Sequence, residues 1–283
     1  MIGIRSKRII SDTVIYIVLA LMVFIWLFPL VWMIMRAFDT NTAFASSTIF
    51  PESFTLANFK NLFTDPNQPY LRWLLNTLIV AIGSCVISTL FVLMVSYALS
   101  RLRFRTRKTL MNIALILGLF PGFLSIIALY YIFEILKLTE NIIGLILAYS
   151  LASGTGYYIV KGFFDTVPMA IDEAARIDGA TKNRIFWQMI IPLSKPIIIY
   201  TILTNFISPW CDFVLANIFM GLGSPDNFTV AIGIKRWLER ELQNAMFTRF
   251  CAGGLLVSVP IVILYIIMQK FYVTGITGGA AKG

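Results

Sequence analysis

The sequence predicts an all-α integral membrane protein whose helices cross the bilayer six times. Of its 283 residues, 58% are hydrophobic and only 13% are charged, and the mean hydropathy is +0.82. A soluble domain carries far more charge, so the composition indicates a membrane protein. Six apolar stretches are each long enough to cross a bilayer, which takes about 20 residues. These stretches cover residues 13–35, 74–99, 109–133, 142–160, 196–222 and 251–271.

The first stretch follows three basic residues, Arg5, Lys7 and Arg8, in the manner of a signal peptide. Its apolar run extends for about 23 residues, whereas the apolar region of a signal peptide has about 7–15. We therefore expect an uncleaved first helix.

The distribution of Lys and Arg predicts that both termini lie in the cytoplasm. With that orientation, 15 of the 23 basic residues fall on the cytoplasmic side, in agreement with the positive-inside rule. The last outer loop is the exception, because it mixes basic and acidic residues and is typical of a short amphipathic element. The expected parts are a cytoplasmic N-terminus (1–12), a transmembrane domain (13–271) and a cytoplasmic tail (272–283). The transmembrane domain includes an extracytoplasmic segment (36–73) with a short helix and a cytoplasmic loop (161–195).

Several classes of function are excluded by what the sequence lacks. Histidine is absent, which removes imidazole bases, imidazole metal ligands and the Ser-His-Asp arrangement. Cys85, Cys211 and Cys251 are far apart in apolar surroundings and are interpreted as packing residues. No GxxxxGK[ST] phosphate loop occurs, so ATP is not expected to bind this chain. We expect no catalytic residue, no metal site and no cofactor here, and the charge of +9 reflects topology rather than nucleic-acid binding.

One cytoplasmic stretch, "EAARIDGATKNRIFWQMIIPLSKP" at residues 173–196, is unusually polar for this chain. Pro168 stands where the first turn of a helix tolerates proline, with Thr166 as a candidate cap. Gly179 is expected to end that helix, because glycine accepts the left-handed conformation. Thr181 is expected to cap a second helix through residue 189 that ends before Pro192. The prediction is a helix–glycine–helix elbow with one apolar face formed by Ile185, Phe186, Met189 and Ile190.

Two interpretations of this elbow are open on physical grounds. Basic amphipathic segments often lie on lipid headgroups. The first half of the elbow, however, carries Asp172, Glu173 and Asp178, which an anionic lipid surface disfavours. Mixed charge favours a docking element for another protein.

The stretch resembles the EAA loop of ABC importer permeases, which has the form EAAxxDGAxxxxxFxxxxxPLxxP. Ten positions match over 24 residues, which makes the pattern specific. The resemblance implies a type I ABC importer permease fold, in which the loop forms coupling helices that seat in a cleft of a cytoplasmic ATPase. Within it Gly179 would be the elbow, with Glu173 and Asp178 as polar contacts or caps and Phe186 as an apolar contact. The coupling residues implied in this way are Glu173, Ala174, Ala175, Asp178, Gly179, Ala180, Phe186 and Pro192.

Two further stretches resemble the carbohydrate-uptake branch of that family. They are "FPLVWMIMRAF" in the first helix and "QKFYVTGITGGAAKG" at the C-terminus, which is similar to the tail of the maltose-type second permease. The tail resemblance implies that Gly279, Lys282 and Gly283 contact the ATPase. It also implies a bacterial plasma-membrane importer for oligosaccharides such as maltose or maltodextrin. The implied partners are a second permease subunit, an ATPase dimer that binds ATP and Mg, and an extracytoplasmic sugar-binding protein.

Polar residues in the fifth predicted span form a candidate sugar path. Asp212 is the one acidic residue placed deep in a span, where charge is costly and usually functional or paired. The alternatives are that Asp212 lies nearer the outer edge of its helix, or that it pairs with a partner subunit. The candidate path comprises Asn205, Trp210, Asp212 and Asn217. In the family that the chain resembles, the main sugar contacts come from the other permease subunit.

Other kinds of membrane protein fit the sequence less well. A secondary transporter driven by an ion gradient predicts internal repeats and paired buried acidic groups; no repeat is evident and only Asp212 is a candidate. An intramembrane enzyme would need a nucleophile–base pair or a metal cluster, and this sequence offers neither. An ABC permease for a different solute is the remaining alternative.

Overall fold

The computed structural model describes residues 4–45, 48, 50, 51, 53–119, 121–152 and 156–280, with side chains from 12 to 269. Over these residues the chain is helical, and its one β element is an isolated bridge between Asp39 and Phe54. The chain divides into two compact units. Unit 1 comprises residues 1–68 and 234–256, and unit 2 comprises residues 69–233 and 257–283. The helices α13 (Val230–Arg236) and α14 (Gln243–Ala280) contribute residues to both units.

The structure contains helices that are long and apolar enough to cross a membrane, as expected for an all-α membrane protein. Within the described residues, three single helices qualify: Asp12–Ala37 of α1 (Ile4–Ala37), α3 (Tyr70–Arg101) and Gln243–Gln269 of α14. Three bent helix pairs also qualify, which gives up to six spans if each pair crosses once. The first pair is α4 (Arg107–Gly118) with α5 (Gly122–Ile135), and the second is α6 (Ile142–Ala152) with α7 (Tyr157–Thr166).

The third bent pair differs from the predicted fifth span. It joins the helical segment Lys182–Leu193 to α11 (Lys195–Cys211) at an angle of 85°. The apolar stretch predicted over 196–222 does not form one helix, because α11 ends at Cys211 and a separate helix, α12 (Val214–Met220), follows. Asp212 has extended backbone angles, and its carboxylate accepts hydrogen bonds from the N–H groups of Val214, Leu215 and Ala216. The carboxylate thus satisfies the free N–H groups that begin α12.

Unit 1 is held by a polar cluster at the end of α1. Arg36 is buried, pairs with Asp39 and donates to the carbonyl of Ala43. Asn58 lies in α2 (Ala57–Thr64), the short helix expected in the segment 36–73. Its side-chain amide donates to the carbonyls of Ala37 (3.0 Å) and Asp39 (2.8 Å). These bonds tie α2 to the end of α1.

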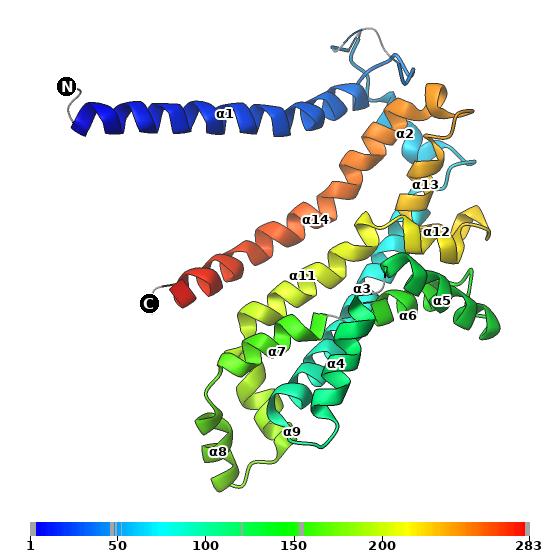
Figure 1. Ribbon diagram of the computed structural model, residues 1–283. Coiled ribbons are helices and arrows are strands. Elements are labelled where there is room, and N and C mark those ends of the chain that lie inside the picture. The colour runs from blue at the N-terminus through cyan, green and yellow to red at the C-terminus, as the bar shows by residue number, and fades with distance from the viewer. Residues whose placement is uncertain are drawn as a thin grey trace. The chain divides into compact units, whose positions relative to one another are not determined.

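In unit 2, α3 is the central helix and packs against α11, α7 and α6 (Figure 1). At its N-terminal end, Trp73 donates to the carbonyl of Pro225 at 2.8 Å, next to the short 3₁₀ helix η3 (Pro225–Asn227). Asn76 donates to the carbonyls of Asp226 and Phe228. At the C-terminal end of α3, an apolar cluster packs the loop 161–195 against α3 and the start of α7. That cluster consists of Val92, Leu93, Tyr97, Leu99, Tyr157, Val160, Phe164, Val167, Ala175, Ile185, Phe186 and Ile190.

Candidate functional site

The predicted elbow is present, and its first helix begins one residue after a proline. α8 (Met169–Ile177) follows α7 across Val167 and Pro168, whose extended backbone breaks the helical run. The expected cap at Thr166 is wrong, because the Thr166 hydroxyl donates to the carbonyl of Phe163 within its own helix. Thr166 is the last residue of α7, and the residue at the N-cap of α8 is Pro168, with no side-chain hydrogen bond to the helix.

Gly179 ends α8 as the sequence predicts. Its φ of +80° lies in the left-handed region, and the N–H of Ala180 donates to the carbonyl of Ala175 at 2.9 Å. The N–H of Gly179 donates to the carbonyl of Arg176 at 3.0 Å. The two bonds together form a Schellman motif, which satisfies the last carbonyls of the helix.

The second helix begins as expected but continues further. The Thr181 side chain accepts a hydrogen bond from the N–H of Arg184, so Thr181 caps α9 (Lys182–Ile185). The helix continues through a π-helical turn, η2 (Phe186–Ile190), into α10 (Ile191–Leu193). The predicted end before Pro192 is therefore wrong. Ile191 bonds back five residues to Phe186, and this wider turn places Pro192 at the start of a new α-helical turn, where its missing N–H costs little.

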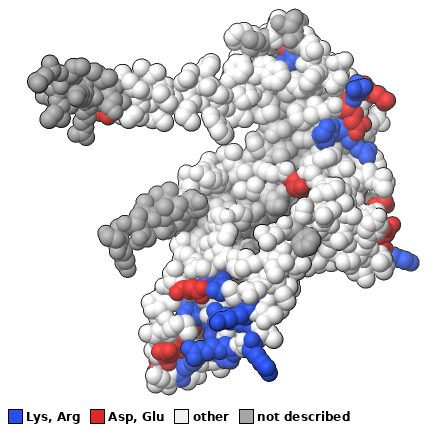
Figure 2. All heavy atoms as spheres, viewed as in Figure 1, with Lys and Arg blue, Asp and Glu red and all other residues white. Residues whose placement is uncertain are grey.

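The elbow has an exposed outer face and a buried inner face. Glu173, Ala174, Asp178 and Gly179 are exposed, and Ile177 is 87% exposed. The inner face belongs to the core of unit 2. Figure 2 shows Lys, Arg and acidic side chains gathered over the end that carries α8 and α9.

Phe186 lies on the inner face rather than on the surface. It is 5% exposed and its ring centroid is 4.8 Å from that of Tyr97. Ala175 is likewise buried, Ala180 is half-buried and Pro192 is exposed. The predicted apolar face of the second helix therefore packs against α3 and α7 of its own chain.

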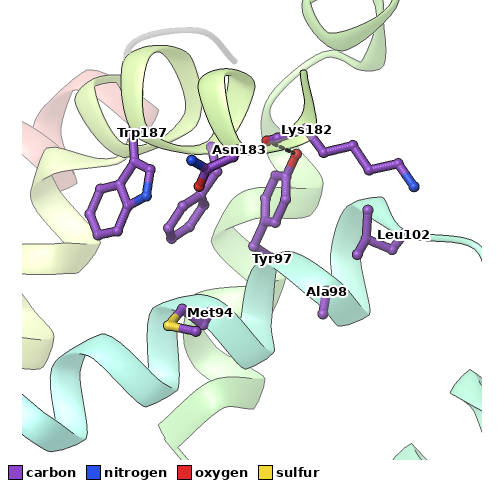
Figure 3. Close-up of a pocket in the computed structure, with 8 residues that line it drawn as sticks. Met94, Tyr97, Ala98, Leu102, Lys182, Asn183 and Trp187 are labelled. Carbon is purple, nitrogen blue, oxygen red and sulfur yellow. Dashed lines mark hydrogen bonds between the residues drawn. The ribbon is translucent and has the colours of Figure 1, made fainter. Parts of the chain in front are cut away.

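A pocket of about 260 Å³ lies between the second helix of the elbow and the end of α3 (Figure 3). Its walls are mostly apolar, and the Tyr97 hydroxyl crosses one side to donate to the carbonyl of Lys182 at 3.1 Å. The lining residues are Met94, Tyr97, Ala98, Leu102, Lys182, Asn183, Phe186 and Trp187.

Arg101, the last residue of α3, contacts three residues of the loop 161–195. Its guanidinium donates to the carbonyls of Phe164 (2.6 Å) and Val167 (2.7 Å), and its Nη1 is 3.2 Å from Asp172 Oδ2. Both side chains of this ion pair are fully or almost fully buried. Removing one partner of a buried ion pair costs about 3–5 kcal/mol, because the other charge is left unpaired.

Sequence reasoning did not identify Arg101, Tyr97 or Ser100 as part of this site. In the sequence, Arg101 was interpreted only as one of the basic residues that set the topology. In the structure, the Ser100 hydroxyl also contacts the loop, because it donates to Asp165 at 2.6 Å. The three side chains are spaced i, i+3 and i+4, which places them on one face of α3. That spacing of polar residues at the end of an apolar helix was the available signal.

The candidate sugar-path residues lie around the break between α11 and α12. Tyr149 of α6 donates to Asp212 at 2.8 Å, in addition to the three backbone donors. Asn205 donates to Thr89 at 3.3 Å, and Trp210 is buried. Asn205 and Trp210 lie in α11, Asp212 lies in the break and Asn217 lies in α12, and their role as a path stays a prediction.

The C-terminal residues fall at the edge of what the structure covers. Gly279 lies in α14, and Lys282 and Gly283 lie outside the described residues. No group of three or more metal-ligating side chains occurs within the residues that the structure describes.

Comparison with known proteins adds relatives over the whole chain. Residues 92–277 match the family described as "Binding-protein-dependent transport system inner membrane component". The galactooligosaccharides transport system permease protein GanQ of Bacillus subtilis is 35% identical, with 99% of this chain and 98% of GanQ covered. The maltodextrin transport system permease protein MalD of Streptococcus pneumoniae is 33% identical, with 99% of each chain covered.

A solved structure shows the same fold. It is a crystal structure of a bacterial ABC transporter involved in the import of the acidic polysaccharide alginate, and the TM-score is 0.78. The match covers 96% of this chain and 99% of the other at 22% identity. The fold is therefore the all-α type I importer permease fold that the sequence resemblance implied. The chain belongs to the binding-protein-dependent transport system inner membrane components, among the permeases of carbohydrate ABC importers.

Proposed function

We propose that this chain is the membrane-crossing subunit of an ABC importer for neutral oligosaccharides, driven by a separate ATPase. The observation that carries the proposal is the elbow at Gly179, which presents an exposed helix at the most charged end of unit 2. Relatives named for galactooligosaccharides and for maltodextrin support the sugar class. Within that class we favour maltose or maltodextrin, on the resemblance of the C-terminal tail.

The proposed docking surface is the outer face of α8. Glu173 offers a carboxylate to a basic group of the ATPase, and Ile177 offers an apolar side chain to a pocket on it. Asp178 and Gly179 fix the angle of the elbow. Ala175 and Phe186 support the surface from beneath, because both are buried in unit 2. We keep the proposed ATPase contacts of the other coupling residues and of the tail. They are Ala174, Ala180 and Pro192 in the loop, and Gly279, Lys282 and Gly283 in the tail.

The proposed mechanism is alternating access. A sugar-loaded binding protein docks outside, and closure of the ATPase dimer on ATP and Mg moves the elbow. That movement turns the helices from an inward-facing to an outward-facing arrangement. The proposed sugar path retains Asn205, Trp210 and Asn217, and Asp212 acts by holding the break between α11 and α12, since its carboxylate already accepts four hydrogen bonds.

The proposal includes a second permease subunit and a bacterial plasma membrane, with both termini in the cytoplasm. The domain division is the one expected from charge, with a permease domain over 13–271, an extracytoplasmic segment over 36–73 and a coupling loop over 161–195.

Co-purification from membranes tests the assembly. A tagged copy of this chain should bring down a second permease and an ATPase with a phosphate loop. Glu173→Ala should reduce the recovered ATPase, whereas Arg103→Gln, an exposed change outside the elbow, should leave it unchanged. Recovery of a homo-oligomer that transports sugar without an ATPase, and stops when the ion gradient is collapsed, would favour the secondary transporter instead.

Uptake competition tests the substrate. Labelled maltotriose should be taken up, and unlabelled maltodextrins should compete better than galactotriose or raffinose. Preferential competition by galactotriose would move the substrate to galacto-oligosaccharides, and competition by none of these sugars would favour a permease for a different solute.

A further inference from the structure

Arg101 joins three helical elements through one side chain. It is the last residue of α3, its two carbonyl acceptors lie at the C-terminal end of α7, and Asp172 lies in the first turn of α8. A cation at the end of α7 and an anion at the start of α8 are each favoured by the partial charges of those helix ends. The planar guanidinium donates to the two carbonyls through one nitrogen and places a second nitrogen beside the Asp172 carboxylate, a geometry that a point-like ammonium matches less well.

The buried pair is weak evidence for stability alone. A buried ion pair loses much of its attraction to desolvation, and apolar residues of similar volume often stabilise a protein as well or better. What the pair does impose is geometry, because α8 cannot shift against the end of α3 without separating two buried charges. The core contacts of Ala175 and the Tyr97–Lys182 hydrogen bond reinforce the same junction.

We propose that Arg101 is the positioning residue that transmits movement of the coupling elbow to α3, through its ion pair with Asp172. The inference rests on the proposed function, since it assumes that an ATPase moves α8. α3 is suited to receive the movement, because it packs against α6, α7 and α11 and reaches the far end of unit 2. Its N-terminal end holds the segment 225–228 through Trp73 and Asn76.

Asp172→Asn is the sharpest test, because it removes the charge that pairs with Arg101 and leaves the carbonyl contacts of Arg101 in place. The complete transporter is reconstituted with its ATPase, second permease and binding protein. The sugar is labelled maltotriose or labelled galactotriose, whichever the wild-type complex imports. We expect the complex to assemble, with sugar imported per ATP hydrolysed lowered by at least about fivefold.

Arg101→Lys is the second variant, for the case in which Asp172→Asn fails to assemble. Its ammonium keeps a charge near Asp172 but cannot reach the two carbonyls as well, so an intermediate loss of sugar per ATP is expected. Arg103→Gln, an exposed change two residues away, is the matched control and should stay within about twofold of wild type.

The readout separates positioning from mere structure. A structural role lowers the amount of complex recovered but leaves the sugar per ATP of the assembled complex at the wild-type value, and that result in either variant would overturn the inference. If no ATPase co-purifies with the wild-type chain, the proposed function fails first. An ATPase that co-purifies and stays fully coupled in either variant refutes the role of Arg101 and leaves the proposed function standing.

Discussion

At the scale of single residues, the elbow depends on one glycine whose requirement is purely conformational. Gly179 has φ +80°, yet a Cβ added there would meet no atom within 4 Å. Any penalty for a side chain therefore comes from the left-handed backbone, at about 1–2 kcal/mol. Gly162 in α7 also has open space around it but has ordinary helical angles, so the two glycines form a matched pair.

We predict that Gly179→Ala lowers the thermal stability of the loop and reduces sugar uptake severalfold, whereas Gly162→Ala leaves both unchanged or raises stability. Alanine suits a helix better than glycine by about 1 kcal/mol. Gly179→Asn should lie closer to wild type, because asparagine tolerates the left-handed region. Melting temperature and uptake in the reconstituted complex measure these effects. Equal losses at the two glycines would contradict the conformational explanation.

A second residue-scale prediction concerns pH. The Arg249 guanidinium donates to Asp65 at 2.6 Å, and together with the N–H of Asn67 it lowers the pKa of the Asp65 carboxyl. A lowered folded pKa stabilises the fold above the unfolded pKa, which is about 3.9, and this contribution is lost as the pH falls through the folded pKa. Asp65 is partly open to solvent, so we expect Asp65→Asn to cost only about 0.5–1 kcal/mol at pH 7. The gap between wild-type and variant melting temperatures should shrink below pH 4; a constant gap would show that the charge is not involved.

At the scale of helices, local chemistry explains what the sequence made predictable. Gly179 and Thr181 act on their immediate neighbours, so the elbow and the second cap followed from residue types alone. The continuation past Pro192 depends on a π turn, which no residue preference marks. The break at Asp212 is a local cap of α12, but it lies within an apolar stretch that was interpreted as one span. The ion pair of Arg101 joins segments far apart in sequence, so the spacing of residues on α3 did not indicate Asp172 as its partner. Tertiary contacts also moved Phe186 from a predicted surface to the core.

An element-scale prediction concerns the packing of α13 against α3. A Cβ added at Gly233 would lie 2.0 Å from the Trp73 ring, which is far inside van der Waals contact. Gly233→Ala should therefore destabilise the protein by about 1–3 kcal/mol, as overpacking does. Gly122→Ala, where a Cβ meets nothing within 4 Å, is the control in thermal unfolding. Recovery of stability when Trp73→Leu is combined with Gly233→Ala would support the clash, and no recovery would place the cost elsewhere.

At the scale of the whole molecule, the length of α3 and the charge distribution together predict a membrane topology. The 32 residues of α3 extend for about 48 Å at about 1.5 Å per residue, which exceeds the hydrocarbon thickness of about 30 Å. We therefore expect α3 to cross the bilayer, with its two ends on opposite sides of the membrane. The exposed residue Ser224 lies near the N-terminal end, through the bond from Trp73 to Pro225, and the exposed Arg105 follows the C-terminal end.

Cysteine labelling tests this topology directly. Cys85 and Cys251 are buried and Cys211 is exposed. The Cys211→Ser variant should therefore react little with a membrane-impermeant maleimide and serves as the background for new cysteines. In intact cells Ser224→Cys should be labelled and Arg105→Cys should not, because the five basic residues at 101–108 hold that end inside. After permeabilisation both should react. Labelling in the reverse order would place the elbow outside the cell, out of reach of any cytoplasmic ATPase, and would refute the coupling proposal at its foundation. Labelling of both in intact cells would show that α3 does not cross the bilayer.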